Sequence, residues 1–258
     1  MKTSLEIQGY EIIVIQSLKE SDRKTGEELF NDILRYKPEI NKDVYVKFYN
    51  AWDYLQFVKT LETIENETPH NHTLTLHFET HGCIDGIGLG DGTLVKWREL
   101  FSLLRPINVK LSNLLMVIMS MCRGAAISSH IEPTLRCPFR AFVGFEKDMK
   151  EGDLLEVYSV FYESYNNMLD VFDALKRANS ILPKDSHAWC LRARDIFDKV
   201  LNPDTNPDSF NKVIEDNYED YVKEKGYISK GEFRQIVCQY FIQTADDNRA
   251  FYNFEDII

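Results

Sequence analysis

Short apolar runs alternate with amphipathic stretches over residues 10–180. The runs are rich in β-branched and aromatic residues, which predicts buried strands. The stretches between them space leucine and isoleucine as one face of a helix does. The predicted strands cover residues 10–18, 43–51, 74–82, 113–122 and 140–148. This alternation predicts βαβ units, and so an α/β fold with a mostly parallel sheet flanked by helices on both faces.

Between the predicted strands, four stretches have helical spacing. They cover residues 25–37, 52–67, 96–108 and 152–181. Because proline cannot donate a backbone hydrogen bond, we expect Pro106 to end the third helix and Pro183 to end the last. The segment Gly86–Val95 instead predicts a small hairpin that turns at Asp91-Gly92.

The C-terminal part of the chain has a different character. Residues 184–258 are acidic and show helical spacing, interrupted by the loop sequence LNPDTNPDSFN. We therefore predict a first domain over residues 1–183 and a helical extension over 184–258. Aromatic side chains in the extension favour its packing on the first domain.

Composition excludes several function classes. The 258 residues carry a net charge of -11, which argues against a nucleic-acid partner, since binding to phosphates requires a basic face. No apolar run reaches the ~18 residues that span a bilayer, and the N-terminus lacks the shape of a signal peptide. The five cysteines form no C-x-x-C pair, so neither a disulfide framework nor a zinc site is indicated. We expect a cytoplasmic protein without a cofactor and without a membrane partner.

Two reactive side chains stand where apolar runs stop. His81 ends the strand predicted over 74–82, and Cys122 ends the strand predicted over 113–122. A helix connects the two strands, so we expect them to be parallel and adjacent, about 4.8 Å apart. In an open parallel sheet, reacting groups gather at the carboxyl ends of the strands. The sequence therefore predicts that His81 and Cys122 face each other at one edge of the sheet.

An imidazole beside a thiol is suited to nucleophilic catalysis. The imidazole can take the proton of the thiol and later protonate a leaving amine. Gly82 follows His81 and lets the backbone approach a substrate, so the N–H groups of Gly82 and Cys122 could stabilise a developing oxyanion.

Other interpretations of these residues remain open. Taken alone, a cysteine that ends an apolar strand is usually a core residue, and a His-Gly pair is usually a turn. We expect His77 to be structural and to point toward a covering helix. A metal site from His77, His81 and Cys83 is disfavoured, because two residues four apart on a strand lie ~13 Å from each other. The glycines of GIGLGDG do not fit a dinucleotide-binding loop, which disfavours a nucleotide-binding domain.

The ordered motifs resemble the caspase-like cysteine peptidases. An apolar strand ending in His-Gly, a hairpin with an Asp-Gly turn, a helix and an apolar strand ending in Cys follow one another as in that family. The segments that carry the resemblance are HFETHG, DGIGLGDGTLVKWREL and LLMVIMSMCRGA. The strand and long helix after Cys122 look like the bacterial CHAT-domain branch in particular. The resemblance covers roughly residues 8–180.

The resemblance implies an endopeptidase with a His-Cys dyad. Cys122 would be the nucleophile and His81 the acid-base, with Gly82 and Cys122 forming the oxyanion hole. It also implies a protein substrate, cut after a charged residue, and by analogy a role in bacterial stress or antiviral defence. A regulatory protein partner is a further expectation. A caspase-like fold that has lost activity and serves as an interaction module, using the C-terminal segment QTADDNRAFYNFEDII, is the alternative.

The sequence leaves open whether the substrate residue before the cut is positively or negatively charged. Caspases have glutamine two residues before the cysteine, and this chain has Ser120, so a cut after aspartate does not follow from the resemblance. Arg23 and Lys24 lie where caspases place a basic residue that grips aspartate. Glu146 and Asp148 lie where separase-like relatives have acidic residues suited to arginine or lysine. An equal alternative is that both sets are solvated charges. Of the two signs, we favour a basic residue before the cut.

Overall fold

A computed structural model of the chain describes residues 6–131, 135–193, 195 and 207–239. The chain divides into two compact units. The first unit consists of Met1–Ile131 and Pro138–Arg192, and the second of Glu132–Cys137 and Ala193–Ile258. The first unit contains the residues that the sequence singles out for chemistry.

A central sheet organises the first unit. Its strand order is β2-β1-β3-β6-β7-β8, and all neighbours are parallel except β7 and β8. The strands are β1 (Gly9–Ser17), β2 (Val44–Asn50), β3 (His72–Gly82), β6 (Leu115–Ser120), β7 (Ala141–Gly144) and β8 (Trp189–Arg192). This sheet confirms the predicted α/β class.

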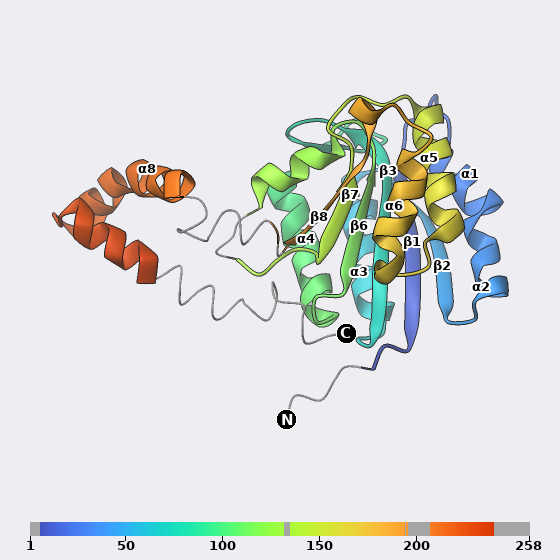
Figure 1. The fold of residues 1–258 in the computed structure, drawn as a ribbon, viewed down its shortest axis with the longest axis horizontal. Coiled ribbons are helices and arrows are strands. Elements are labelled where there is room, and N and C mark those ends of the chain that lie inside the picture. The colour runs from blue at the N-terminus through green and yellow to red at the C-terminus, as the bar shows by residue number, and fades with distance from the viewer. Residues whose placement is uncertain (1–5, 132–134, 194, 196–206, 240–258) are drawn as a thin grey trace. The chain divides into compact units, whose positions relative to one another are not determined.

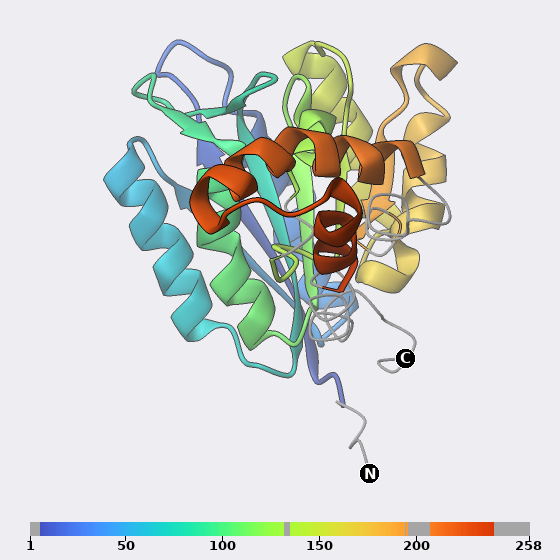
Figure 2. The same ribbon diagram turned by 90° about the vertical axis from the view of Figure 1, so that its left-hand side faces the viewer.

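Helices cover both faces of the sheet (Figures 1 and 2). On one face lie α1 (Thr25–Asp32), α5 (Glu151–Ser164) and α6 (Val171–Asn179), and on the other lie α3 (Tyr54–Glu67) and α4 (Trp97–Lys110). The short segments η1 (Leu34–Tyr36) and α2 (Lys37–Ile40) connect α1 to β2. Two-sided cover explains why the central strands are apolar without alternation: Ile12, Ile13, Val14 and Ile15 are all at most 1% exposed.

The predicted hairpin follows β3. It consists of β4 (Gly86–Gly88) and β5 (Leu94–Lys96), which pair antiparallel. At its turn Gly92 has a φ of 91° and donates its N–H to the Leu89 carbonyl. A left-handed conformation of this kind favours glycine, so the Asp91-Gly92 turn is confirmed.

Pro106 does not end the third helix as expected. Helix α4 continues through Pro106 to Lys110. The proline is exposed, whereas Leu104 and Ile107 on either side of it are buried. Burial of this apolar face therefore outweighs the backbone hydrogen bond that proline cannot make.

The long helix predicted over residues 152–181 is in fact two helices. Helix α5 ends at Ser164, and a short turn η3 (Met168–Asp170) leads into α6. Tyr165 leaves the helix and its hydroxyl lies 2.6 Å from that of Thr75 on β3. The Asn166 N–H bonds the side chain of Asp170, which holds the turn. Side-chain bonding by asparagine and aspartate competes with helix continuation.

The region after residue 183 contains both strand and helix. Residues 189–192 form β8, which extends the sheet of the first unit beyond the boundary drawn from the sequence. In the second unit, α8 (Pro207–Lys225) and a helical segment over residues 230–239 enclose a small cluster of Phe210, Ile214 and Phe233. These helices agree with the helical character predicted there, while the packing of the extension stays a prediction.

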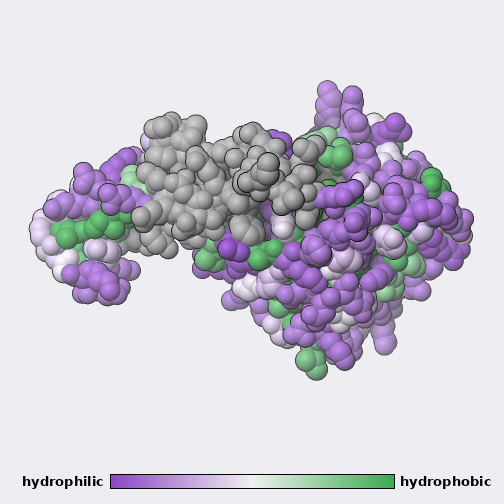
Figure 3. Space-filling model, turned by 90° about the horizontal axis from the view of Figure 1, so that it is seen from below, coloured by the Kyte–Doolittle hydropathy of each residue, from purple (hydrophilic) through white to green (hydrophobic). Residues whose placement is uncertain are grey.

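The larger body in Figure 3 shows mainly hydrophilic side chains on the face in view, with small scattered hydrophobic patches. Among the described residues, no helix combines the length and the apolar character that crossing a bilayer would require.

Candidate active site

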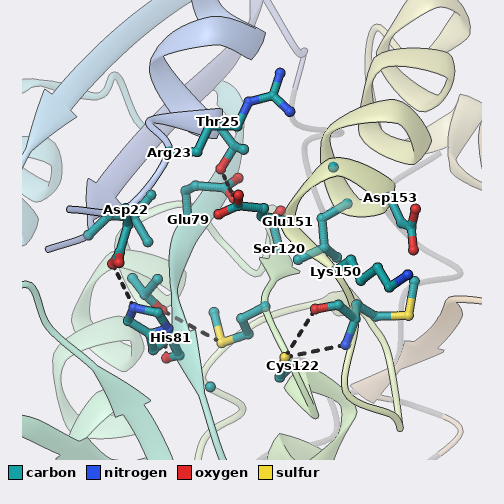
Figure 4. A pocket seen from close by; sticks show the side chains of 17 residues that line it. Asp22, Arg23, Thr25, Glu79, His81, Ser120, Cys122, Lys150, Glu151 and Asp153 are labelled. Carbon is teal, nitrogen blue, oxygen red and sulfur yellow. Dashed lines mark hydrogen bonds and ion pairs between the residues drawn. The ribbon is translucent and has the colours of Figure 1, made fainter.

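The strand register brings the carboxyl ends of β3 and β6 together. Glu79 of β3 pairs with Ser120 of β6. His81 and Cys122 each lie two residues further along their own chains, so they occupy matching positions. Both line the same pocket (Figure 4), which confirms that these two segments share one edge of the sheet.

The two segments approach closely at Gly82. A Cβ atom placed on Gly82 would overlap the carbonyl oxygen of Cys122 and lie 2.7 Å from Cγ of Met121. Only glycine avoids this overlap without a shift of the backbone. Steric crowding therefore explains why residue 82 is a glycine. Gly82 and Cys122 both line the pocket.

The pocket is an open cavity of about 670 Å³ at the carboxyl edge of the sheet. Its wall comes from the loop after β1, the ends of β3 and β6, and the segment that enters α5 (Figure 4). This is the position at which parallel sheets hold their ligands.

His81 is held by a carboxylate. Its Nε2 lies 2.8 Å from Oδ2 of Asp22, in the loop between β1 and α1. Asp22 also accepts the backbone N–H of Lys19 at 2.8 Å. Partial burial alone would raise the pKa of Asp22, but the hydrogen bonds from His81 and Lys19 lower it below its ordinary value. The carboxylate is thus ionised near neutral pH and fixes the orientation of the imidazole.

Cys122 lies in the sharp turn after β6. Arg123 next to it has a φ of 54°, and η2 (Gly124–His130) follows. The thiol contacts the backbone of Met149, just before α5: the Met149 N–H donates to Sγ at 3.3 Å and Sγ–H donates to the Met149 carbonyl at 3.4 Å. The turn therefore presents the thiol at the pocket wall, where it is partly exposed.

A buried polar chain lies deeper in the pocket wall. Glu79 accepts the Thr25 hydroxyl at 2.6 Å, and its other oxygen lies 3.0 Å from Nε2 of His77. Nδ1 of His77 is 3.1 Å from the hydroxyl of Tyr162 on α5. His77 is fully buried and stands edge-on to Tyr158, so it points toward a covering helix as predicted.

Acidic groups outnumber basic ones around the pocket. Its lining holds four acidic side chains and two basic ones: Asp22, Glu79, Glu151 and Asp153 against Arg23 and Lys150. Arg23 already pairs with Glu28, at 2.6 Å.

The candidate specificity residues lie in different places. Arg23 lines the pocket, whereas Lys24 donates to the carbonyls of Leu18 and Lys19. Glu146 and Asp148 are exposed and are not part of the described lining. Asp148 bonds Arg123 at 2.8 Å.

Asp22, Glu79 and Met149 line the pocket and make contacts that matter to the site, but they had no role in the sequence prediction. Strand alternation could have found Glu79, because residues 77, 79 and 81 share one face of β3. No local signal marks Asp22, since its partner is 59 residues away in the chain.

Comparisons with known proteins support the fold. No protein-family model matches the sequence, and no curated protein matches it either. Among solved structures, the crystal structure of the Drosophila initiator caspase Dronc is similar, with a TM-score of 0.54 and 14% sequence identity. The match covers 74% of this chain and 82% of that one. The chain therefore has a caspase-like fold.

Proposed function

We propose that the protein is a cysteine endopeptidase that uses His81 and Cys122 as a catalytic dyad. The observation that carries this proposal is the shared pocket, where an imidazole oriented by a carboxylate and a partly exposed thiol stand at the ends of adjacent parallel strands. The caspase-like fold supports the assignment by analogy.

In the proposed reaction, Sγ of Cys122 gives its proton to the imidazole and attacks the carbonyl carbon of the scissile bond. Because Nε2 of His81 is hydrogen-bonded to Asp22, Nδ1 is the nitrogen that takes the proton of the thiol. The negative oxygen of the tetrahedral intermediate receives hydrogen bonds from the N–H groups of Gly82 and Cys122. The intermediate collapses, His81 protonates the departing amine, and a thioester remains. Water, deprotonated by His81, hydrolyses the thioester and restores the thiol.

Substrates of the proposed enzyme are proteins cut after a charged residue, and the acidic excess around the pocket favours a basic one. The sequence analogy to the CHAT-domain branch extends the proposal to a cytoplasmic role in bacterial defence or stress, with a regulatory protein partner. Glu146 and Asp148 are candidates for contacts further from the cut, since they are exposed just before the Met149 segment.

A second candidate function is an inactive caspase-like interaction module. The contact of the Cys122 thiol with the Met149 backbone favours it, because a thiol held there is not poised for attack. The C-terminal segment 243–258, which could bind a partner, lies outside the described residues.

A positional-scanning library of fluorogenic peptides separates the two functions. An endopeptidase cleaves members of the library, and Cys122→Ala or His81→Ala abolishes turnover while far-UV circular dichroism is unchanged. Cys83→Ala is the matched control, since Cys83 is also a partly exposed free cysteine beside His81 and Gly82. Turnover that survives in either dyad variant would exclude the dyad, and no turnover with the wild-type protein would favour the interaction module.

A further inference from the structure

We infer that Glu79 and Ser120 form the floor of a subsite that binds the cationic side chain of the residue before the cut. This inference rests on the proposed function, and it assigns a specificity-determining role to two residues inside the sheet. Arginine and lysine are the side chains that the subsite would take.

The position of Glu79 and Ser120 supports this assignment. The two residues pair across β3 and β6, and each lies two residues before a member of the dyad in the chain. Glu79 and His81 share one face of β3, while Cys122 lies in the turn that follows the end of β6 at Ser120. Two residues of strand span roughly 6.6 Å. A lysine or arginine side chain entering beside Cys122 has about this reach, so its charged end arrives at Glu79. Both residues line the pocket (Figure 4).

The charge of the pocket floor also supports a cationic ligand. Glu79 is only 4% exposed, and among the described residues it contacts the Thr25 hydroxyl and the His77 ring. On the other side of His77, Nδ1 lies 3.1 Å from the Tyr162 hydroxyl, so Glu79 ends a buried chain of hydrogen-bonding groups. Within the described part of the chain, no lysine or arginine pairs with Glu79.

A buried carboxylate without a cationic partner is costly, and a ligand cation would offset that cost. Hydrogen-bonding contacts with Thr25 and His77 keep the carboxylate of Glu79 in place. The subsite is therefore built to hold a negative charge at its floor before any ligand arrives, which is the arrangement that favours recognition of a guanidinium or an ammonium.

A hydrogen-bonding group without a partner among the described residues lies beside Glu79. The Ser120 Oγ atom is buried, and it has no hydrogen-bond partner among the residues that the structure describes. It lies on the strand neighbouring Glu79 at the paired position. Buried polar atoms are nearly always satisfied in native proteins, so an unsatisfied one beside a pocket indicates a ligand donor. A guanidinium can donate to Glu79 and Ser120 at once.

The remaining charges of the pocket disfavour an acidic side chain. Arg23, the residue that could grip aspartate, is paired with Glu28 through three contacts of 2.6–3.2 Å. Glu151 and Asp153 add negative charge at the mouth. An aspartate in the subsite would therefore meet repulsion from Glu79.

The test compares peptide substrates that differ only in the residue before the cut: arginine, its neutral isostere citrulline, and aspartate. We expect kcat/KM for arginine to exceed that for citrulline by at least ~30-fold, the loss usual when one member of a buried charge pair is removed. Glu79→Gln should abolish this preference and change cleavage after citrulline less than about threefold. Ser120→Ala should lower cleavage after arginine about three- to tenfold.

Glu62→Gln is the matched control, since it removes an exposed carboxylate on α3 outside the described lining. Glu146→Gln and Asp148→Asn test whether these two acidic residues read the cation instead of Glu79. Equal cleavage after arginine and citrulline by the wild-type protein would overturn the subsite while leaving the peptidase proposal intact. A preference that survives in Glu79→Gln but is lost in Glu146→Gln would overturn it equally.

A binding measurement decides the inference even if no peptide is cleaved. Mass spectrometry measures the rate at which iodoacetamide alkylates Cys122. Benzamidine should slow this alkylation, and its neutral isostere benzamide should not. The protection should vanish in Glu79→Gln. Equal protection by both compounds, or none by either, would refute the cationic subsite. Arginine can be compared with citrulline, and benzamidine with benzamide, in the wild-type protein. The inference is therefore testable even if Glu79→Gln fails to fold.

Discussion

The carboxylate of Asp22 lies 2.8 Å from Nε2 of His81 and ties the loop after β1 to the end of β3. The imidazole is 55% exposed, so packing alone would leave it free to rotate. Asp22 is less exposed, at 21%, and is itself held by the backbone of Lys19. The pair therefore turns a mobile surface side chain into an oriented one, which a proton-transfer group requires.

We expect Asp22→Asn to lower kcat of the proposed peptidase by about 10²–10³-fold. An amide keeps the size of the side chain but removes the negative charge that stabilises the imidazolium and fixes its tautomer. KM should stay within about threefold, because Asp22 does not belong to the floor of the subsite. Steady-state kinetics on one peptide measures both constants. A rise in KM with unchanged kcat would contradict a positioning role.

Gly82→Ala should damage the site through sterics alone. The added Cβ overlaps the Cys122 carbonyl, so one of the two segments that carry the dyad must move. We expect a destabilisation of about 1–3 kcal/mol and a loss of activity of at least ~100-fold. Thermal unfolding and peptide turnover report these effects. Gly231→Ala is the control, because its nearest neighbour is Ser229 Oγ at 3.9 Å; equal behaviour of the two variants would contradict the prediction.

Tyr162→Phe should destabilise the first unit by removing the hydrogen bond to His77. The change leaves Nδ1 of a fully buried imidazole without its partner. An unsatisfied buried group costs about 1–3 kcal/mol, which lowers Tm by about 2–12 °C in a unit of this size. Differential scanning calorimetry measures the shift. Tyr45→Phe, at an exposed position, should leave Tm within about 2 °C. If the Tm of Tyr162→Phe were as high as that of Tyr45→Phe, the hydrogen bonds through His77 would contribute little to stability.

Features set by burial and strand order were predictable from the sequence. The apolar runs of β1, β3 and β6 are buried on both faces, which is why their pattern identified a parallel sheet. Since parallel strands end at one edge, the positions of His81 and Cys122 followed from where two runs stop. The Asp91-Gly92 turn was predictable because its chemistry is local.

Features set by tertiary contacts were not predictable. Pro106 should end a helix by local rules, but the buried face of α4 continues past it. The break after Ser164 depends on Tyr165 reaching Thr75, 90 residues away. The pairing of Asp22 with His81 depends on a loop whose sequence has no periodicity. That no lysine or arginine of the described residues pairs with Glu79 appears only once its neighbours are known.

Stability at alkaline pH should depend on Lys37, at the start of α2. The side chain is 6% exposed and Nζ donates to Asn166 at 3.1 Å. Burial lowers the pKa of Lys37 from 10.5 to about 8, although Asp170 nearby opposes the shift. Between pH 8 and 10.5 the unfolded chain binds more protons at this site than the folded protein, so the contribution of Lys37 to stability rises with pH over that window.

Lys37→Met removes this titration and isolates it from all other groups. Below pH 8 the wild-type protein bears the cost of a buried charge, and this cost disappears as the pH rises. The free energy of unfolding of the wild type, minus that of the variant, should therefore increase by roughly 1–3 kcal/mol between pH 7.5 and 10. The raised pKa of buried Tyr158, Tyr162 and Tyr165 destabilises both proteins equally at high pH and cancels in the difference. Urea unfolding at several pH values measures it, with Lys59→Met as the control at an exposed lysine. A difference that does not change with pH would show that Lys37 is solvated in the folded protein.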